Sequence, residues 1–233
     1  MKKLLLLAGV ATVAFSVNAN ACDWKPYISA KLTASNLSLD TSSREIWDDG
    51  DIERNFGSGD DSQHVWGTSL AAGISNGAIR AELEWHRNTA AKLSSNNAVI
   101  WAGDPENESH KTKIKTDAIL LNAYYDFDTA SAFTPYIGAG IGYGKTKIAN
   151  ANGDNYGWFR KNTFSHTNIA WQIGAGIAYA LNDNVSVDVG YRYIDYGKFD
   201  IKKTGRAYGS NYRQRDSYQA TENELYAGIR YSF

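Results

Sequence analysis

From residue 22 onward, apolar and polar side chains alternate with a period of two, and this pattern constrains the fold more than any other feature of the sequence. Successive side chains of a β-strand point to opposite faces of a sheet, so such alternation predicts strands. No segment has convincing helical periodicity. We predict eight strands, at about 26–35, 64–74, 78–87, 115–127, 135–147, 166–180, 184–196 and 220–233.

The two faces of these strands differ in chemistry. One face is apolar except at Thr68, for example at Ile28, Leu83 and Ile141, and carries no charge. The other face is rich in glycine and carries four cations and four anions, namely Lys31, Arg80, Arg192, Arg230, Glu82, Glu84, Asp188 and Glu224. A charge on the lipid-facing side of a membrane barrel costs roughly 2–4 kcal/mol at the bilayer midplane. The uncharged face therefore suits lipid, and the charged face suits a lumen filled by ion pairs.

The connections between the strands alternate in length. Tight links lie near residues 75–77, 128–134 and 182–184, and long polar segments lie at about 36–63, 88–114, 148–165 and 197–219. Short turns at one end and long loops at the other are typical of bacterial membrane barrels. We predict an all-β fold, an eight-stranded antiparallel transmembrane β-barrel with up-and-down meander topology and four long extracellular loops. A soluble lipocalin-like barrel is the alternative, but its outside would then be mostly glycine.

The aromatic residues of the apolar face support the membrane interpretation. With both termini in the periplasm, one group (Trp66, Trp85, Tyr143, Trp171) falls at the outer ends of the strands. A second group that includes Tyr179 falls at the inner ends, with aliphatic residues between. Two aromatic belts around an aliphatic band match the two interfaces of a bilayer. We therefore predict a location in the bacterial outer membrane.

The first 21 residues have a different composition. Lys2 and Lys3 precede an apolar stretch too short to span a bilayer, and Ala19 and Ala21 form a small-x-small cleavage site. These features predict a signal peptide over 1–21 and a barrel domain over 22–233. The single cysteine, Cys22, would then begin the exported chain, either as a free thiol or as a lipidated residue.

Four motifs in the second half of the chain resemble those of known membrane barrels. They are residues 134–143 (TPYIGAGIGY), 170–179 (AWQIGAGIAY), 184–193 (NVSVDVGYRY) and 224–233 (ELYAGIRYSF). They resemble the outer-membrane β-barrel superfamily that includes the opacity-family porins and the OmpA-like barrels. This resemblance implies a surface-exposed barrel of a Gram-negative bacterium, often an adhesin or antigen and sometimes called a porin.

The sequence gives little support for catalysis or for a cofactor. Residues 166–168 faintly resemble the His-x-Ser-Asn of lipid A deacylases, but Thr167 replaces the serine nucleophile. His64, His86 and His110 lack the spacing of metal ligands, and the acidic segment 48–51 lacks the ligand pattern of an EF-hand. We expect no enzyme, no cofactor and no metal. A formal net charge of −1 gives no reason to expect nucleic acid as a partner.

Binding through the loops is the leading functional hypothesis, and a passive pore for small solutes is the alternative. The last polar segment is basic and includes five cations, at Lys202, Lys203, Arg206, Arg213 and Arg215. These cations suit sulfated glycans, lipopolysaccharide phosphates or a host-cell receptor. The alternative is that they merely neutralise the anionic outer leaflet or pair with the acidic segment at about 37–65. Paired lumen charges predict little conductance.

The C-terminal strand ends with an aromatic pattern, Tyr231 and Phe233. The family resemblance implies that the outer-membrane barrel assembly machinery reads such an end. A strand whose backbone groups are still unpaired offers an edge that another sheet can engage. We therefore predict that these two residues act as an assembly signal.

Overall fold

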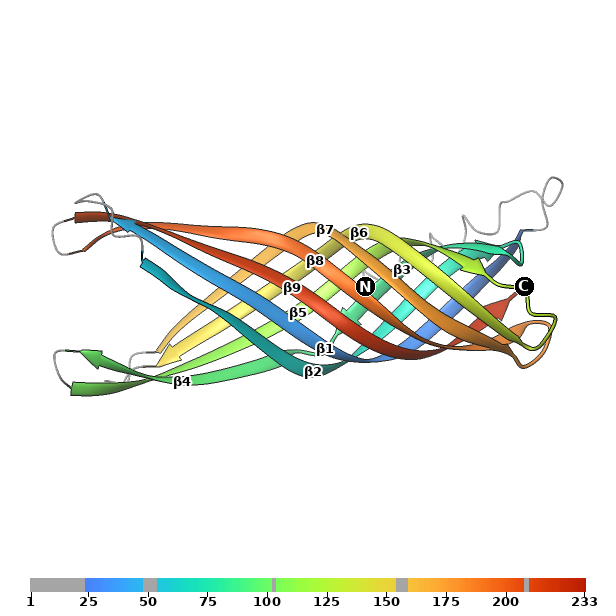
Figure 1. Cartoon of the computed structure of the whole chain (residues 1–233), viewed down its shortest axis with the longest axis horizontal. Helices are drawn as coiled ribbons and strands as arrows, with labels where there is room; N and C mark the ends of the chain where they lie inside the picture. Colours follow the sequence, from blue (N-terminus) through green and yellow to red (C-terminus); the bar gives the residue numbers. More distant parts are fainter. Residues whose placement is uncertain (1–23, 48–53, 102–103, 154–158, 208–209) are drawn as a thin grey trace, which may run out of the picture.

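The chain folds into one antiparallel β-sheet that closes on itself (Figure 1). This computed structural model describes residues 24–47, 54–101, 104–153, 159–207 and 210–233. The strands are β1 (Lys25–Trp47), β2 (Arg54–Ser75), β3 (Ile79–Asn88), β4 (Ala91–Trp101), β5 (Asp104–Asp126), β6 (Phe133–Gly153), β7 (Phe159–Ala180), β8 (Val185–Ala207) and β9 (Ser210–Ser232). Among these residues, no helix is long and apolar enough to cross a membrane.

Eight strand positions make up the barrel, because β3 and β4 share one of them. β3 pairs with residues 117–125 of β5, and β4 pairs with residues 104–114 of the same strand. Thr89 lies in the short break between β3 and β4, and its backbone N–H donates to the carbonyl of Trp66 at 2.7 Å. β1 and β9 pair over most of their length and close the barrel. The prediction of an eight-stranded antiparallel barrel is therefore confirmed.

The strands are much longer than the sequence analysis predicted. The four polar segments assigned to long loops are strand for most of their length, and pairing continues as far as Glu45↔Arg54, Trp101↔Asp104 and Gly153↔Phe159. The loop assignment was wrong here because a ladder of backbone hydrogen bonds does not require apolar side chains. Residues 48–53, 102–103, 154–158 and 208–209 lie outside the described ranges.

The closed barrel divides into two sheets on its extracellular side. The pairing of β2 with β3 ends at Gly67↔Asn88, and that of β7 with β8 ends at Trp171↔Asp195. Beyond these points, β2-β1-β9-β8 form one four-stranded sheet and β4-β5-β6-β7 form the other. The two sheets diverge at the end of the molecule opposite the C-terminus (Figure 1).

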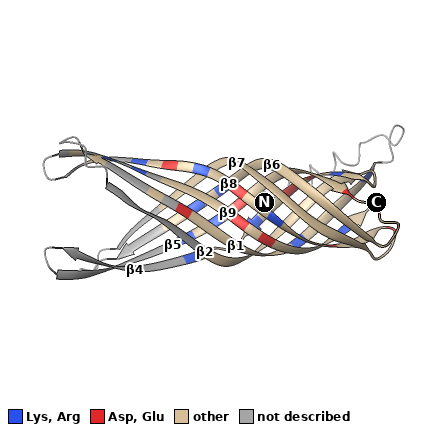
Figure 2. Ribbon diagram, viewed as in Figure 1, with Lys and Arg blue, Asp and Glu red and all other residues tan. Residues whose placement is uncertain are grey.

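Within the closed part, the apolar face points outward. Leu32, Trp66 and Ile141 expose 68%, 69% and 59% of their surfaces, as expected for side chains that contact lipid. Most of the charged residues lie in the middle of the barrel and on the extracellular parts of the strands (Figure 2). The charges of the middle section lie on the buried face of the strands, where Glu84 and Glu224 are fully buried.

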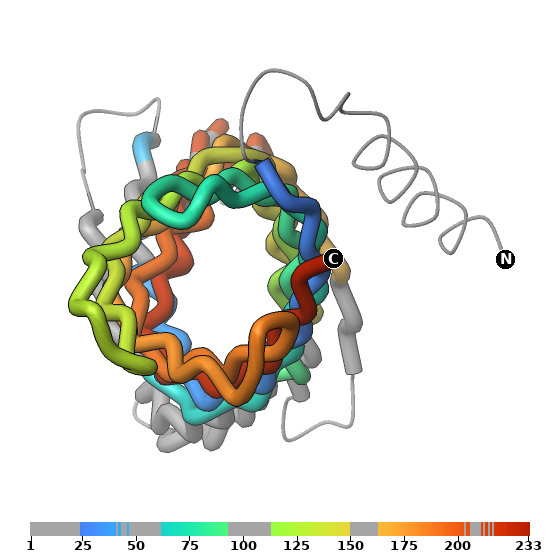
Figure 3. Tube along the Cα trace, turned by 90° about the vertical axis from the view of Figure 1, so that its right-hand side faces the viewer, coloured from blue at the N-terminus to red at the C-terminus, as the bar shows by residue number. Residues whose placement is uncertain are grey.

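The interior changes character on the extracellular side. Viewed along its axis, the chain forms a ring (Figure 3), and side chains fill it. Beyond the charged layer, the inward positions become apolar and form a buried cluster that includes Leu37, Ile114, Ile148, Ile194 and Phe199. The apolar face therefore points outward in the membrane and inward in the two projecting sheets, as water on the outside requires.

Candidate functional site

The lumen holds a network of buried ion pairs between strands that are distant in the sequence. Lys31 on β1 donates to Glu82 Oε1 and Glu84 Oε2 of β3, both at 3.0 Å. Arg192 on β8 donates to Glu84 Oε1 at 2.6 Å and to Glu224 Oε1 of β9 at 2.5 Å. Each of these side chains is at least nine-tenths buried. The network therefore ties four strands together across the lumen.

The other two lumen cations lie nearer the periplasmic end. Arg80 pairs with Asp126 at 2.8 Å, and Arg230 lies 3.5 Å from Asp188. The guanidinium of Arg80 also lies 4.5 Å and 4.6 Å from the ring centroids of Tyr124 and Tyr136, within cation–π range. The sequence analysis missed Asp126 because this residue comes at the end of its strand, next to a turn.

Neutral polar side chains fill the gaps between the charges. Asn122 donates to Glu84 at 3.0 Å, and its carbonyl oxygen accepts from Gln172 at 2.6 Å. Gln172 in turn accepts from Arg192 at 2.9 Å, and Tyr124 donates to Glu82 at 2.8 Å. The alternation placed these residues on the inner face, but nothing in the sequence singled them out. Their bonds satisfy the carboxylates, which a low-dielectric interior demands.

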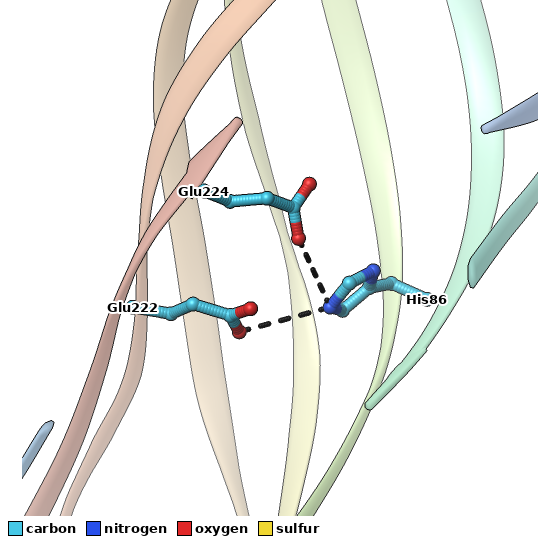
Figure 4. Close-up of side chains that lie close together, drawn as sticks. All are labelled: His86, Glu222 and Glu224. Atoms are coloured by element: carbon cyan, nitrogen blue, oxygen red, sulfur yellow. Dashed lines mark ion pairs between the residues drawn. The ribbon is translucent and has the colours of Figure 1, made fainter. Parts of the chain in front are cut away.

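A second cluster lies on the extracellular side of this network and consists of His86, Glu222 and Glu224 (Figure 4). His86 on β3 points across the lumen toward the two carboxylates of β9. Its Nε2 lies 3.4 Å from Glu224 Oε2 and 3.7 Å from Glu222 Oε2. All three side chains are fully buried. The sequence analysis missed this cluster because its members come from opposite ends of the chain, and Glu222 was not considered.

The two projecting sheets carry exposed cations on their outer faces. In the register of β8 and β9, Lys202 lies opposite Arg215, and Arg213 is two residues from Arg215 on the same strand face. All three side chains are exposed. The side chains of Lys203 and Arg206 lie outside the described part of the structure. The backbone therefore brings together Lys202, Arg213 and Arg215, three of the cations of the basic segment.

The acidic side chain of Asp200 lies among these cations. Asp200 is 3.2 Å from Arg215, and its Oδ1 accepts a hydrogen bond of 2.6 Å from Ser217. This hydrogen bond, together with the neighbouring cations, holds the pKa of Asp200 below its ordinary value.

The other sheet also carries exposed lysines that the sequence analysis did not single out, and four of them lie on β5 and β6. In the register of β5 and β6, Lys115 lies opposite Lys147. Lys113 lies two residues from Lys115 on β5, and Lys145 lies two residues from Lys147 on β6. They begin two residues beyond Tyr143, which closes the apolar band. The Lys-x-Lys spacing on both strands was the available signal. We call Lys113, Lys115, Lys145 and Lys147 the lysine quartet.

The remaining candidates show no catalytic arrangement in the described residues. His166 is exposed and stacks on Phe199 with ring centroids 4.8 Å apart, and the amide of Asn168 donates to the carbonyl of Lys198. Residues 48–51 and Cys22 lie outside the described ranges. Because Thr167 takes the place of a serine nucleophile and His166 is engaged with a ring, the deacylase resemblance gains no support.

The C-terminal aromatics point outward at the periplasmic end. Tyr231 and Phe233 expose 43% and 47% of their surfaces, and their rings meet edge to face at 5.1 Å. The backbone N–H of Phe233 donates to the carbonyl of Pro26 at 3.0 Å, so the last residue takes part in closing the barrel.

Comparison with known families shows what kind of barrel this is. The family model described as "Outer membrane protein beta-barrel domain" matches residues 4–233. Among solved structures, the outer membrane protein OprG from Pseudomonas aeruginosa superposes with a TM-score of 0.52 at 16% identity, covering 91% of this chain and 98% of OprG. The fold and the location in the bacterial outer membrane are therefore established.

Two sequence relatives are informative. The outer membrane protein PagN of Salmonella typhimurium is 33% identical over 157 residues, which cover 66% of this chain and 65% of PagN. A candidate adhesin of Rickettsia conorii is 30% identical over 132 residues, covering 55% of this chain and 52% of that protein. The chain thus spans less than two-thirds of either relative.

Proposed function

The chain belongs to the outer membrane protein β-barrel domain family, and from this we propose that it is a surface adhesin that binds anionic glycans through its β8–β9 hairpin. The exposed cations Lys202, Arg213 and Arg215 carry the proposal, because they lie several residues beyond the apolar band, where a ligand outside the cell can reach them. Sulfate groups of a glycan accept charge-assisted hydrogen bonds from such side chains. The likeness to a candidate adhesin supports the same role. Opacity-type specificity remains a prediction.

Binding of intact bacteria to a heparin-coated surface tests this proposal. The triple variant Lys202→Gln, Arg213→Gln and Arg215→Gln should lose most of its binding, and wild-type binding should weaken as salt is added. The matched control replaces Lys113, Lys115 and Lys147 by Gln, which removes the same charge from the other sheet. Equal loss in both variants, or undiminished binding to desulfated heparin, would contradict a specific role of the hairpin.

The lysine quartet favours a second interaction, with phosphate groups of lipopolysaccharide. Its members directly follow the outer aromatic belt, at the level where the lipid phosphates of the outer leaflet lie. Four exposed ammonium groups on two paired strands suit a phosphorylated surface. Replacement of the quartet by Gln should reduce copurification of phosphorylated lipid A, whereas the hairpin variant should retain it.

We infer that the barrel is neither a pore nor an enzyme. The ion-pair network and the apolar cluster fill the lumen at successive levels, which supports a closed barrel. Among the described residues around His166, no nucleophile lies in hydrogen-bond contact with a base. The barrel then serves as a rigid scaffold, and the projecting sheets carry the binding surfaces.

A further inference from the structure

The charges of the central lumen do not balance. Lys31 and Arg192 face four buried carboxylates, those of Glu82, Glu84, Glu222 and Glu224. The lower pairs, Arg80–Asp126 and Arg230–Asp188, balance each other. With His86 neutral, two negative charges in the central layer therefore lack a counter-charge, and burying unpaired charge is costly.

Each member of the His86, Glu222 and Glu224 cluster has one unsatisfied polar atom (Figure 4). His86 Nε2, Glu222 Oε1 and Glu224 Oε2 are buried without a hydrogen-bond partner. The distances of 3.4 Å and 3.7 Å from Nε2 to the carboxylates are too long for good hydrogen bonds. The distance to Glu224 Oε2 is close to the separation of about 3.3 Å between two ligands that each lie 2.0–2.1 Å from a tetrahedral ion. Glu222 has its free oxygen in Oε1, since its Oε2 already accepts two hydrogen bonds.

We propose that His86, Glu222 and Glu224 bind one divalent transition-metal ion, with Zn²⁺ as the best match, and that this ion links β3 to β9 across the lumen. Imidazole together with carboxylate is a donor set typical of Zn²⁺, whereas Ca²⁺ and Mg²⁺ prefer oxygen ligands alone. A divalent ion also supplies the two positive charges that the layer lacks.

The surrounding side chains hold the three ligands in position. Arg192 fixes Glu224 through Oε1, while Asn88 and Tyr196 donate to Glu222 Oε2 at 2.7 Å and 2.6 Å. Each carboxylate thus keeps its other oxygen for the ion. Such outer contacts orient metal ligands and raise their affinity.

The histidine can present Nε2 as a lone pair. Ser69 Oγ lies 2.9 Å from Nδ1 and can accept a hydrogen bond from it when the proton is on Nδ1. Arg192 Nη2 lies 3.1 Å from Nδ1 and 3.2 Å from Ser69 Oγ, so in the metal-bound form it donates to the serine oxygen. The contact with Ser69 is therefore compatible with the tautomer that metal binding needs.

The alternative to a bound metal ion is protonation of the cluster. One proton on His86 and one on a carboxylate would neutralise the central layer equally well. Metal content separates the two. The full barrel, carrying no polyhistidine tag, is refolded in detergent with Zn²⁺, exchanged into metal-free buffer, and analysed by mass spectrometry for bound metal. Because the site is closed on both sides, the ion is supplied during refolding.

The wild-type barrel should retain about one Zn²⁺ per chain, as expected for a buried three-ligand site. His86→Gln and Glu222→Gln should retain none, whereas His64→Gln, which changes an exposed histidine, should retain the ion. Co²⁺ in place of Zn²⁺ should give visible absorption bands of a four-coordinate site, absent from His86→Gln. Ser69→Ala should lower affinity by about tenfold or more.

Heat-modifiable gel mobility shows that each variant is folded before its metal content is compared. A folded wild-type barrel without retained metal, or a folded His86→Gln barrel with as much metal as the wild type, overturns the proposal. If His86→Gln does not fold, Glu222→Gln decides, because amide and carboxylate have the same shape.

Discussion

Replacing Arg192 by alanine should destabilise the barrel more than any exposed ion pair can. Arg192 contacts Glu84, Glu224, Gln172, Ser69 and His86. Its removal leaves Glu224, which is fully buried, without the guanidinium that lies 2.5 Å from its Oε1. Breaking a buried pair by removing one partner costs about 3–5 kcal/mol, so we expect a loss of this size in the free energy of unfolding.

The matched control is Arg87→Ala on β3. Arg87 pairs with Asp117 at 3.1 Å, but the two side chains are 46% and 35% exposed. An exposed pair of this kind contributes about 0–1 kcal/mol. Urea unfolding in lipid vesicles, followed by tryptophan fluorescence, measures both variants.

A double variant isolates the cause of the effect. Arg192→Met combined with Glu224→Gln removes the cation and one carboxylate together, so it should cost less than Arg192→Ala by at least about 1 kcal/mol. If Arg192→Ala costs no more than Arg87→Ala, the network contributes nothing beyond filling space, and the reasoning fails.

Three further predictions follow from other parts of the molecule. Planar-bilayer recordings should show no stable channel, since buried charges and the apolar cluster close the lumen in turn; steady single-protein openings would favour the pore hypothesis. Deletion of Phe233 should slow assembly in cells far more than it lowers the unfolding midpoint in vitro, as protease shaving and gel mobility can show; normal assembly would leave it as one more lipid-facing residue. Ser217→Ala should raise the pKa of Asp200, measured by carbon NMR titration, because the carboxylate loses its hydrogen bond. The Asp200–Arg215 pair should then be lost at a higher pH on acidification than in the wild type; an unchanged titration would exclude Ser217 as the cause.

Period-two alternation by itself determined the number of strands, their direction and the lipid-facing side. These properties depend on residues that are close in the sequence, and a slip of one residue would have inverted every face. Leu32, Ile141 and Leu225 therefore appear on the outside as expected. The same alternation placed Lys31, Glu84 and Arg192 on the inner face.

The ends of the strands were predicted poorly, although the sequence holds a signal. In β1 the apolar positions are even-numbered up to Ala34 and odd-numbered from Leu37, and β5 and β6 show the same change near Ile114 and Ile148. Where the apolar residues move from the outward-facing to the inward-facing positions of a continuous strand, the surroundings of the barrel change from lipid to water. A polar composition alone was mistaken for a loop.

Only the tertiary structure decided which buried groups meet. Whether Arg192 reaches Glu84, and whether His86 faces Glu222, depends on the stagger between strands that are far apart in the chain. That stagger follows from closing the whole sheet at one tilt, which no local pattern specifies. The charge imbalance at His86, Glu222 and Glu224 is therefore a property of the closed barrel, and the sequence supplies only the residues that create it.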